Sequence, residues 1–303
     1  MWFVFSLIAL LCWSGSDLFS KIGCREKDDK LSHLKMVTAV GIVMGLHCAY
    51  EVFIQGVSLT PKVILTYLPV SALYIGSMAI GYIGLRYIEL SISSPICNSS
   101  GALVAILTLI TAGRSEVNNY QLVAVILVCI GVVGLGIVEA SEDDELRLKR
   151  QEAGNFIYTK SVLALALPII YCLLDALGTF ADSIVLEKIN EDSANCAYEL
   201  TFFIVGILCL VYSLCIKKDK EYKVKREVPK YIGACFETAG QFAYIYALAD
   251  SEHVMLSAPI ISAYCVASVV WSRLFLKEKL SIKHYLAIAT VAVGIVIIGV
   301  FDA

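Results

Sequence analysis

Ten apolar stretches, each long enough to cross a lipid bilayer, occupy almost the whole chain. A membrane-spanning helix needs about 20 predominantly apolar residues, because the hydrocarbon core is about 30 Å thick. The stretches cover residues 2–22, 34–55, 63–85, 91–112, 119–139, 161–185, 194–216, 229–249, 254–276 and 284–301. Since backbone polar groups inside a membrane must bond to one another, the stretches predict ten transmembrane α-helices.

The composition argues against a water-soluble fold. Hydrophobic residues make up 58% of the chain and charged residues 17%, whereas a soluble domain has about a quarter of its residues charged. The first stretch has no basic residue ahead of it and carries Asp17 near its end, so we expect a retained helix and not a cleaved signal. The sequence therefore predicts an all-α integral membrane protein.

Basic residues are distributed unevenly among the connecting loops. Of the 24 lysines and arginines, 21 lie in or beside the loops that follow the first, third, fifth, seventh and ninth stretches. Basic loops stay on the cytoplasmic side during insertion. We therefore expect the odd-numbered loops in the cytoplasm, both termini outside, and a multi-pass protein of the cell (inner) membrane.

Eleven cysteines raise the question of disulfides or a metal site. The chain has no CxxC pair, and most of the cysteines fall inside apolar stretches, where they act as small apolar side chains. We predict no metal site and no cofactor.

Several residues recur at almost one offset along the chain, in the same order. The pairs, 163 to 165 residues apart, are Asp17 with Asp182, Pro95 with Pro259, Gly131 with Gly294, and Gly136 with Gly299. Pro95 and Pro259 are each expected to open the fourth helix of a unit. A common offset of this kind indicates a duplicated five-helix unit.

Five is an odd number, so the second unit must enter the membrane from the opposite side. Basic loops of the first unit correspond to loops with few basic residues in the second unit, and the reverse, which fits this arrangement. The predicted architecture is two inverted five-helix repeats, a design common among secondary transporters. The expected organisation is a first repeat at 1–139, a cytoplasmic linker at 140–160 and a second repeat at 161–303.

The first helix contains Trp13-Ser14-Gly15-Ser16-Asp17 followed by Lys21, and residues 274–281 (LFLKEKLS) precede a glycine-bearing apolar helix. With the two prolines and the ten stretches, these features resemble the drug/metabolite transporter superfamily, in the branch built from two EamA-type repeats. Residues 112–116 echo the terminal signature only loosely. The resemblance implies secondary transport, often export of metabolites or amino acids, through a central cavity between the repeats.

Ionisable groups at membrane depth are costly and mark candidate functional sites. The candidates are Asp17, His47, Glu51, Asp175, Asp182 and Glu237, with Gln241 one turn after Glu237. Asp182 follows Asp175 by two turns on the same helix face, and His47 and Glu51 are close enough to touch. As alternatives, Asp17 and Asp182 cap helix ends or bond to Lys21 and Lys188, and His47 is a hydrogen-bonded core histidine.

The deep candidates are acidic apart from one histidine, and no deep lysine or arginine stands among them. Either the carboxyl groups carry protons in the apolar interior, or they face a wet cavity and meet a cation. We hypothesise that Asp175 and Glu237 line the central cavity and bind a proton or an amine-bearing solute in exchange.

Aromatic and small polar residues extend this candidate site. Trp13, Tyr171, Tyr244 and Tyr264 lie inside the predicted spans, where they either shape a cavity or serve packing. Asn98 and Ser262 correspond between the repeats, one turn past each proline, and either contact a ligand or bond between helices.

Other functions fit the sequence less well. The chain lacks the HExxH, GxSxG and GxxxxGK motifs, so we expect no enzyme, and no filter-like segment indicates a channel. The predicted function is secondary active transport of a small polar metabolite, such as an amino acid or amine, by a proton-coupled or exchange mechanism and in the export direction. A sugar or nucleotide-sugar transporter of the same fold and a non-transporting membrane scaffold remain alternatives. The expected partners are the solute, the lipid bilayer and protons, without nucleic acid, and the sequence leaves monomer or homodimer open.

Overall fold

The computed structural model describes residues 1–25, 29–87, 90–112, 118–141, 145, 162–219, 222–277 and 281–302, and in these ranges the regular structure is helical. The helices are α1 (Trp2–Cys24), α2 (Ser32–Tyr50), α3 (Pro61–Gly84), α4 (Leu90–Cys97), α5 (Ser100–Ala112), α6 (Asn119–Ala140), α8 (Val162–Leu186), α9 (Glu191–Val211), α10 (Val224–Leu248), α11 (Val254–Ser262), α12 (Tyr264–Phe275) and α13 (Ile282–Asp302). Short π-helical segments, Glu51–Gln55 and Tyr212–Ile216, extend α2 and α9, and a 3-10 turn, Ser251–His253, precedes α11.

Local sequence signals fix several helix ends. The Thr60 side chain accepts a hydrogen bond from the Val63 amide, and Pro61 occupies the first turn of α3, where its missing N–H costs nothing. Asn190 caps α9 in the same way, accepting from the Ser193 amide. Gly56 has φ +78° and ends the segment after α2, a conformation that glycine adopts without a steric penalty.

The fourth and ninth predicted spans are each broken into two helices. Pro95 and Pro259 do not open these spans as predicted, because they lie inside α4 and α11. The breaks come a few residues later, at Asn98 and Ser99 between α4 and α5, and at Ala263 between α11 and α12. A proline removes one hydrogen bond of the helix ladder, and here the ladder is interrupted within the following turn.

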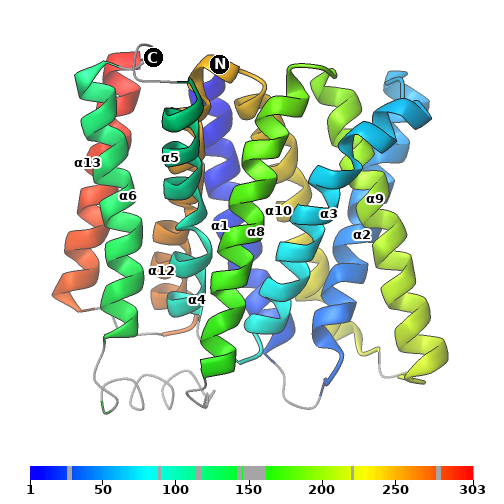
Figure 1. Ribbon diagram of the computed structural model, residues 1–303. Coiled ribbons are helices and arrows are strands. Elements are labelled where there is room, and N and C mark those ends of the chain that lie inside the picture. Colours follow the sequence, from blue (N-terminus) through cyan, green and yellow to red (C-terminus); the bar gives the residue numbers. More distant parts are fainter. Residues whose placement is uncertain are drawn as a thin grey trace.

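The helices form one bundle in which partners far apart in sequence pack side by side (Figure 1). Closely packed pairs include α1 with α10, α6 with α13, α2 with α9, α3 with α8, α2 with α10, and α5 with α11. The start of α1 and the end of α13 lie at the same end of the bundle (Figure 1). The C-terminal ends of α1 and α9 lie at the opposite end (Figure 1).

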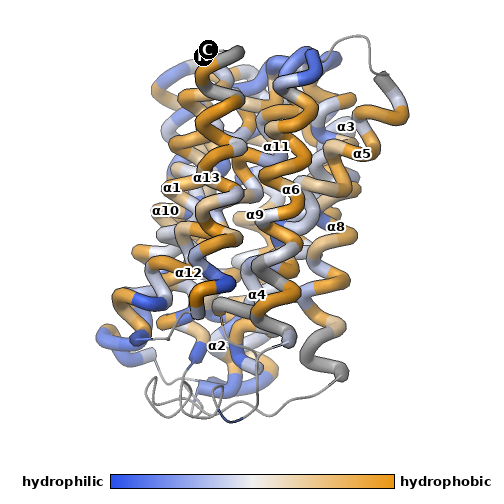
Figure 2. Tube along the Cα trace, turned by 90° about the vertical axis from the view of Figure 1, so that its left-hand side faces the viewer, coloured by the Kyte–Doolittle hydropathy of each residue, from blue (hydrophilic) through white to orange (hydrophobic). Residues whose placement is uncertain are grey.

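Large apolar side chains cover the outside of the bundle. Hydrophobic residues dominate its middle and hydrophilic residues gather toward its two ends (Figure 2). Within the described ranges, seven helical segments are long and apolar enough to span a membrane: Trp2–Cys24, Ser32–Gln55, Pro61–Gly84, Ser93–Thr111, Ala166–Leu186, Glu191–Ile216 and Ser251–Phe275. Shorter apolar stretches lie in α6 and α13, at Leu122–Gly134 and Ile282–Ile297. The chain is thus an all-helical, multi-pass membrane protein.

The predicted linker at 140–160 lies almost wholly outside the described residues, and so does most of the signature expected at 112–116. The second signature, at 274–281, is described only up to Lys277 and from Ser281.

Candidate functional site

A cavity lies in the middle of the bundle, between α1, α3, α4, α5, α8, α9, α10, α11 and α12, with about 940 Å³ of space between its wall atoms and at its opening. Ten of the residues singled out from the sequence line it: Trp13, Asp17, Asn98, Tyr171, Asp175, Glu237, Gln241, Tyr244, Ser262 and Tyr264. The cavity therefore collects residues from nearly the whole length of the chain.

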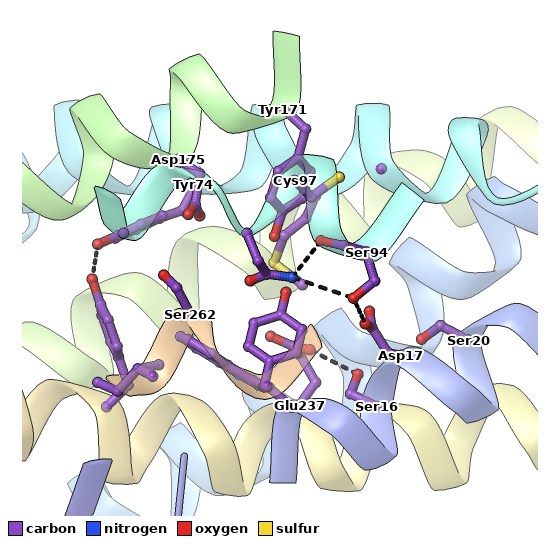
Figure 3. Close-up of a pocket in the computed structure, with 18 of the residues that line it drawn as sticks. Ser16, Asp17, Ser20, Tyr74, Ser94, Cys97, Tyr171, Asp175, Glu237 and Ser262 are labelled. Carbon is purple, nitrogen blue, oxygen red and sulfur yellow. Dashed lines mark hydrogen bonds between the residues drawn. The ribbon is translucent and has the colours of Figure 1, made fainter. Parts of the chain in front are cut away.

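Three carboxylates face this cavity from three different helices. Asp17 lies on α1, Asp175 on α8 and Glu237 on α10, and their side chains point into the same space (Figure 3). Glu237 interacts electrostatically with both of the other two. The fold thus brings together acidic groups that lie up to 220 residues apart in sequence.

Serine hydroxyls orient each of the three carboxylates. Ser16 donates to Glu237 Oε2 at 2.7 Å and Ser100 donates to Asp175 Oδ2 at 2.7 Å. Asp17 Oδ2 accepts from two serines, Ser94 of α4 and Ser268 of α12. Since these donors are neutral, the bonds hold the carboxylates in place without cancelling their charge.

The broken helices supply part of this wall. Ser94 of α4, Asn98 in the break after α4 and Ser262 at the end of α11 line the cavity. Ser100, at the start of α5, donates to the Asp175 carboxylate of the wall. The two broken spans approach closely at Gly101, where a Cβ would lie 2.3 Å from Ser262 Oγ. A glycine is needed there, because any side chain would displace α11 from α5.

Among the described residues that line the cavity there is no lysine, arginine or histidine. The alternative in which Lys21 pairs with Asp17 is not what the structure shows, because the Lys21 ammonium donates to the Leu85 carbonyl at 2.8 Å. The cavity is an acidic compartment in the apolar part of the protein, and electrostatic interactions there are stronger than in water.

Asp182 does not line the cavity, although the sequence places it two turns after Asp175. Its side chain is 0% exposed. Tyr67 donates to Asp182 Oδ1 at 2.7 Å, and the Tyr74 hydroxyl lies 3.4 Å from Oδ2. Because Tyr74 lines the cavity, Asp182 sits directly behind the cavity wall.

His47 and Glu51 also lie away from the cavity, between α2 and α9. His47 Nε2 is 3.7 Å from Glu51 Oε1, so the predicted pair is present. The shorter contact joins His47 Nδ1 to Glu199 Oε1 at 2.8 Å, and the Glu199 side chain is 0% exposed. The sequence analysis missed Glu199, although an ionisable residue inside the apolar stretch 194–216 was an available signal. Asn195, one turn earlier, also donates to it.

Other wall residues were also missed by the sequence reasoning. Ser16 and Ser20 flank Asp17 on α1 and line the cavity with it. Together with Trp13 they repeat at helical spacing, and this polar stripe on an apolar helix was the available signal. Ser94 and Ser100 had no such signal, because their role depends on the break between α4 and α5. Within the described ranges, no group of three or more His, Cys, Asp or Glu side chains is placed to hold a metal ion.

The bundle and its polar central cavity define a multi-pass membrane transport protein. The profile of the EamA-like transporter family matches residues 158–300. This match covers the second half of the chain, and it supports the resemblance to the EamA branch of the drug/metabolite transporter superfamily that the sequence indicated.

One of the similar solved structures is a crystal structure of a protein with a TM-score of 0.66 and 12% sequence identity, covering 98% of this chain and 96% of that chain. At this identity the similarity concerns the fold alone. The comparison with curated proteins gives no match.

Proposed function

We propose that this protein is a secondary active transporter that moves a small, amine-bearing polar solute outward through the central cavity, in exchange for protons. The observation that carries the proposal is the set of Asp17, Asp175 and Glu237 around one cavity whose wall contains no basic residue. A membrane protein without a transported cation has no reason to keep several carboxylates at this depth, where each costs several kcal/mol.

The charge of the cavity favours an amine over the alternative solutes. Two unit charges about 5 Å apart interact by roughly 3 kcal/mol at an effective dielectric constant of about 20. An ammonium group near Asp175 or Glu237 gains attraction of this size, and the phosphates of a nucleotide sugar would meet repulsion. A neutral sugar would be neither attracted nor repelled by these charges. A scaffold protein would not need the cavity.

Exchange follows from the same groups. A carboxyl group at this site holds either a proton or the solute ammonium, and it cannot hold both. Protons arriving from the outside therefore release the solute there, and loss of those protons to the cytoplasm lets the next solute bind. This competition by itself couples the export of the solute to the entry of protons.

We further propose that the chain has ten membrane spans, arranged as two inverted repeats of five helices each. Reciprocal contacts between α6 and α13 support this. A Cβ at Gly131 would lie 3.0 Å from the Ala287 carbonyl, and one at Gly294 would lie 2.8 Å from the Ala124 carbonyl. Gly294 corresponds to Gly131, and Ala287 corresponds to Ala124, each at an offset of 163 residues. The contact of the first unit with the second is therefore matched by the same contact of the second with the first.

The α2–α9 contact has the same reciprocity. A Cβ at Gly41 would lie 2.8 Å from the Phe202 carbonyl, and one at Gly206 would lie 3.2 Å from the Val37 carbonyl, at an offset of 165. In addition, α1 and α8, which begin the two units, run in opposite directions through the bundle (Figure 1). Such pairs allow one unit to rock against the other around a fixed site.

Transport by purified protein in proteoliposomes tests the function. Labelled amines, amino acids and sugars are supplied with and without a pH gradient, to the wild type and to Asp175→Asn and Glu237→Gln. We expect gradient-dependent amine flux that falls at least about tenfold in each variant, because the amide cannot exchange a proton at this pH. Glu252→Gln, at the exposed turn before α11, is the matched control and should keep the wild-type rate. Wild-type flux in both cavity variants would refute the proposal.

A further inference from the structure

Four side chains of the cavity wall carry polar atoms that have no hydrogen-bond partner among the described residues. They are Trp13 Nε1, Ser20 Oγ, Tyr82 OH and Gln241 Nε2. Ser20, Tyr82 and Gln241 are the most deeply buried of them, at 1%, 6% and 3% exposed, so bulk water does not solvate these three. Unpaired polar groups at this depth cost stability unless a ligand or water completes them, and these three line one cavity.

The three groups lie beside two of the carboxylates. Gln241 follows Glu237 by one turn on the same face of α10, which separates such side chains by about 5–6 Å at Cβ. Ser20 lies one turn after Asp17 on α1 (Figure 3). The Tyr82 hydroxyl, from α3, interacts electrostatically with both carboxylates. The wall therefore presents anionic oxygens and neutral groups able to donate hydrogen bonds within the span of one small molecule.

Each of these groups offers a proton to a ligand. The amide nitrogen of Gln241 is a donor only, and the hydroxyls of Ser20 and Tyr82 each have a free O–H. The ligand must then carry a hydrogen-bond acceptor close to its ammonium group. A carboxylate would be a poor acceptor here, because it would lie next to Asp17 and Glu237 and would find no basic side chain on the wall.

We propose that the cavity binds a monocation that carries an ammonium group and, a few bonds away, a neutral acceptor such as the hydroxyl of an amino alcohol or the carbonyl of an amino-acid amide. It prefers these compounds to free amino acids, whose carboxylate the site repels. The apolar part of the wall, with Met78, Leu90 and Ile261 among others, accommodates an apolar body. This inference rests on the proposed function, since it specifies the solute of the same site.

Three matched probes test the selectivity by calorimetric titration of the purified full-length protein at neutral pH. Phenylalaninol has the ammonium and a neutral hydroxyl, phenylalanine has the ammonium and a carboxylate, and phenethylamine has the ammonium alone. We expect phenylalaninol to bind about tenfold more tightly than each of the other two, as one well-placed hydrogen bond allows. Equal or tighter binding of phenylalanine overturns the inference.

Variants assign the effect to the unpaired groups. Gln241→Leu should weaken phenylalaninol to the level of phenethylamine and leave phenethylamine unchanged, and Tyr82→Phe should do the same if the first variant does not fold. Gln55→Leu, at an exposed glutamine after α2, is the matched control and should bind all three probes as the wild type does. Equal phenylalaninol affinity in Gln241→Leu, Tyr82→Phe and wild type also overturns the inference.

The same titration separates this inference from the proposed function. If phenylalanine binds best and Glu237→Gln abolishes its binding, the proposed transport of an amine-bearing solute still stands. Only the inference that the solute carries a neutral acceptor then fails. If no amine binds to the wild type, both proposals fail.

Discussion

The hydroxyl groups of Tyr74 in α3 and Tyr244 in α10 hydrogen-bond to each other across the cavity wall. The Thr179 hydroxyl of α8 lies 3.2 Å from the Tyr74 hydroxyl and 3.1 Å from the Tyr244 hydroxyl. Behind them Asp182 Oδ1 accepts from Tyr67, and the Tyr74 hydroxyl lies 3.4 Å from Asp182 Oδ2. Three helices are thus joined by one buried polar network that separates Asp182 from the cavity.

The first prediction concerns this network. Tyr67→Phe removes the shortest hydrogen bond to the buried Asp182, and a buried acceptor that loses its donor costs about 1–3 kcal/mol. We expect a clearly lower Tm in detergent, measured by intrinsic fluorescence. Tyr285→Phe, at a tyrosine that is 50% exposed on α13, should leave the Tm unchanged. Equal Tm values for the two variants would contradict the assigned role of Tyr67.

The second prediction uses two glycines of α6 that lie three residues apart. A Cβ at Gly131 would lie 2.4 Å from Val291 Cγ2, whereas a Cβ at Gly134 would meet nothing within 4 Å. Gly131→Ala should therefore force α6 away from α13 and lower the stability by about 1–3 kcal/mol. Gly134→Ala should be neutral or stabilise slightly, since alanine favours a helix. Thermal unfolding of both variants checks this contrast, and an equal effect would mean that the two helices do not pack as described.

The third prediction concerns the pair of His47 and Glu199. His47→Leu leaves the buried Glu199 with Asn195 as its remaining hydrogen-bond donor. Because His47 is 29% exposed, we expect a loss of about 1–3 kcal/mol, below the usual cost of breaking a fully buried pair.

A double-mutant cycle provides the control for the third prediction. Adding Glu199→Leu to His47→Leu should recover part of the lost stability, because the unpaired acid is then gone. Purely additive losses in Tm would show that the two side chains do not interact. Glu51→Gln should have a smaller effect, since the Glu51 contact is longer.

The fourth prediction concerns orientation in the membrane. In a background without the native cysteines, we expect Lys217→Cys and Ser141→Cys to react with a membrane-impermeant maleimide only from the cytoplasmic side. Both positions follow helices, α6 and α9, that end at the end of the bundle opposite the N-terminus (Figure 1). Glu252→Cys, at the opposite end, should react only from outside. Labelling of Lys217→Cys and Ser141→Cys from different sides would refute the proposed topology.

Much of the fold follows from the sequence because a bilayer admits few solutions. Long apolar stretches must become helices there, since no water is present to satisfy the backbone. The helices begin and end close to the predicted limits. Pro95 and Pro259 were wrongly predicted to open their helices, and the breaks after them were not predicted, because a proline shows that the ladder is interrupted but does not say in which turn.

The acidic character of the site was also readable from the sequence. Asp175 and Glu237 stood out because charge is costly at membrane depth, whatever the neighbours are. The sequence favoured Asp175 over Asp182 for the cavity, although the two share a helix face at two turns' distance. The structure adds that Tyr74, which lines the cavity, contacts Asp182, so that Asp182 lies behind the wall.

The sequence by itself determined the helical, membrane-spanning class and the residues whose burial needs explanation, because hydropathy and periodicity are local properties. The tertiary structure alone decided that Asp17, Asp175 and Glu237 share one cavity, that serines orient them, and that Ser20, Tyr82 and Gln241 lack partners. These are relations between residues up to 251 positions apart in the chain, and they depend on which helix faces pack together. Packing of that kind is set by the shape and contacts of the whole bundle.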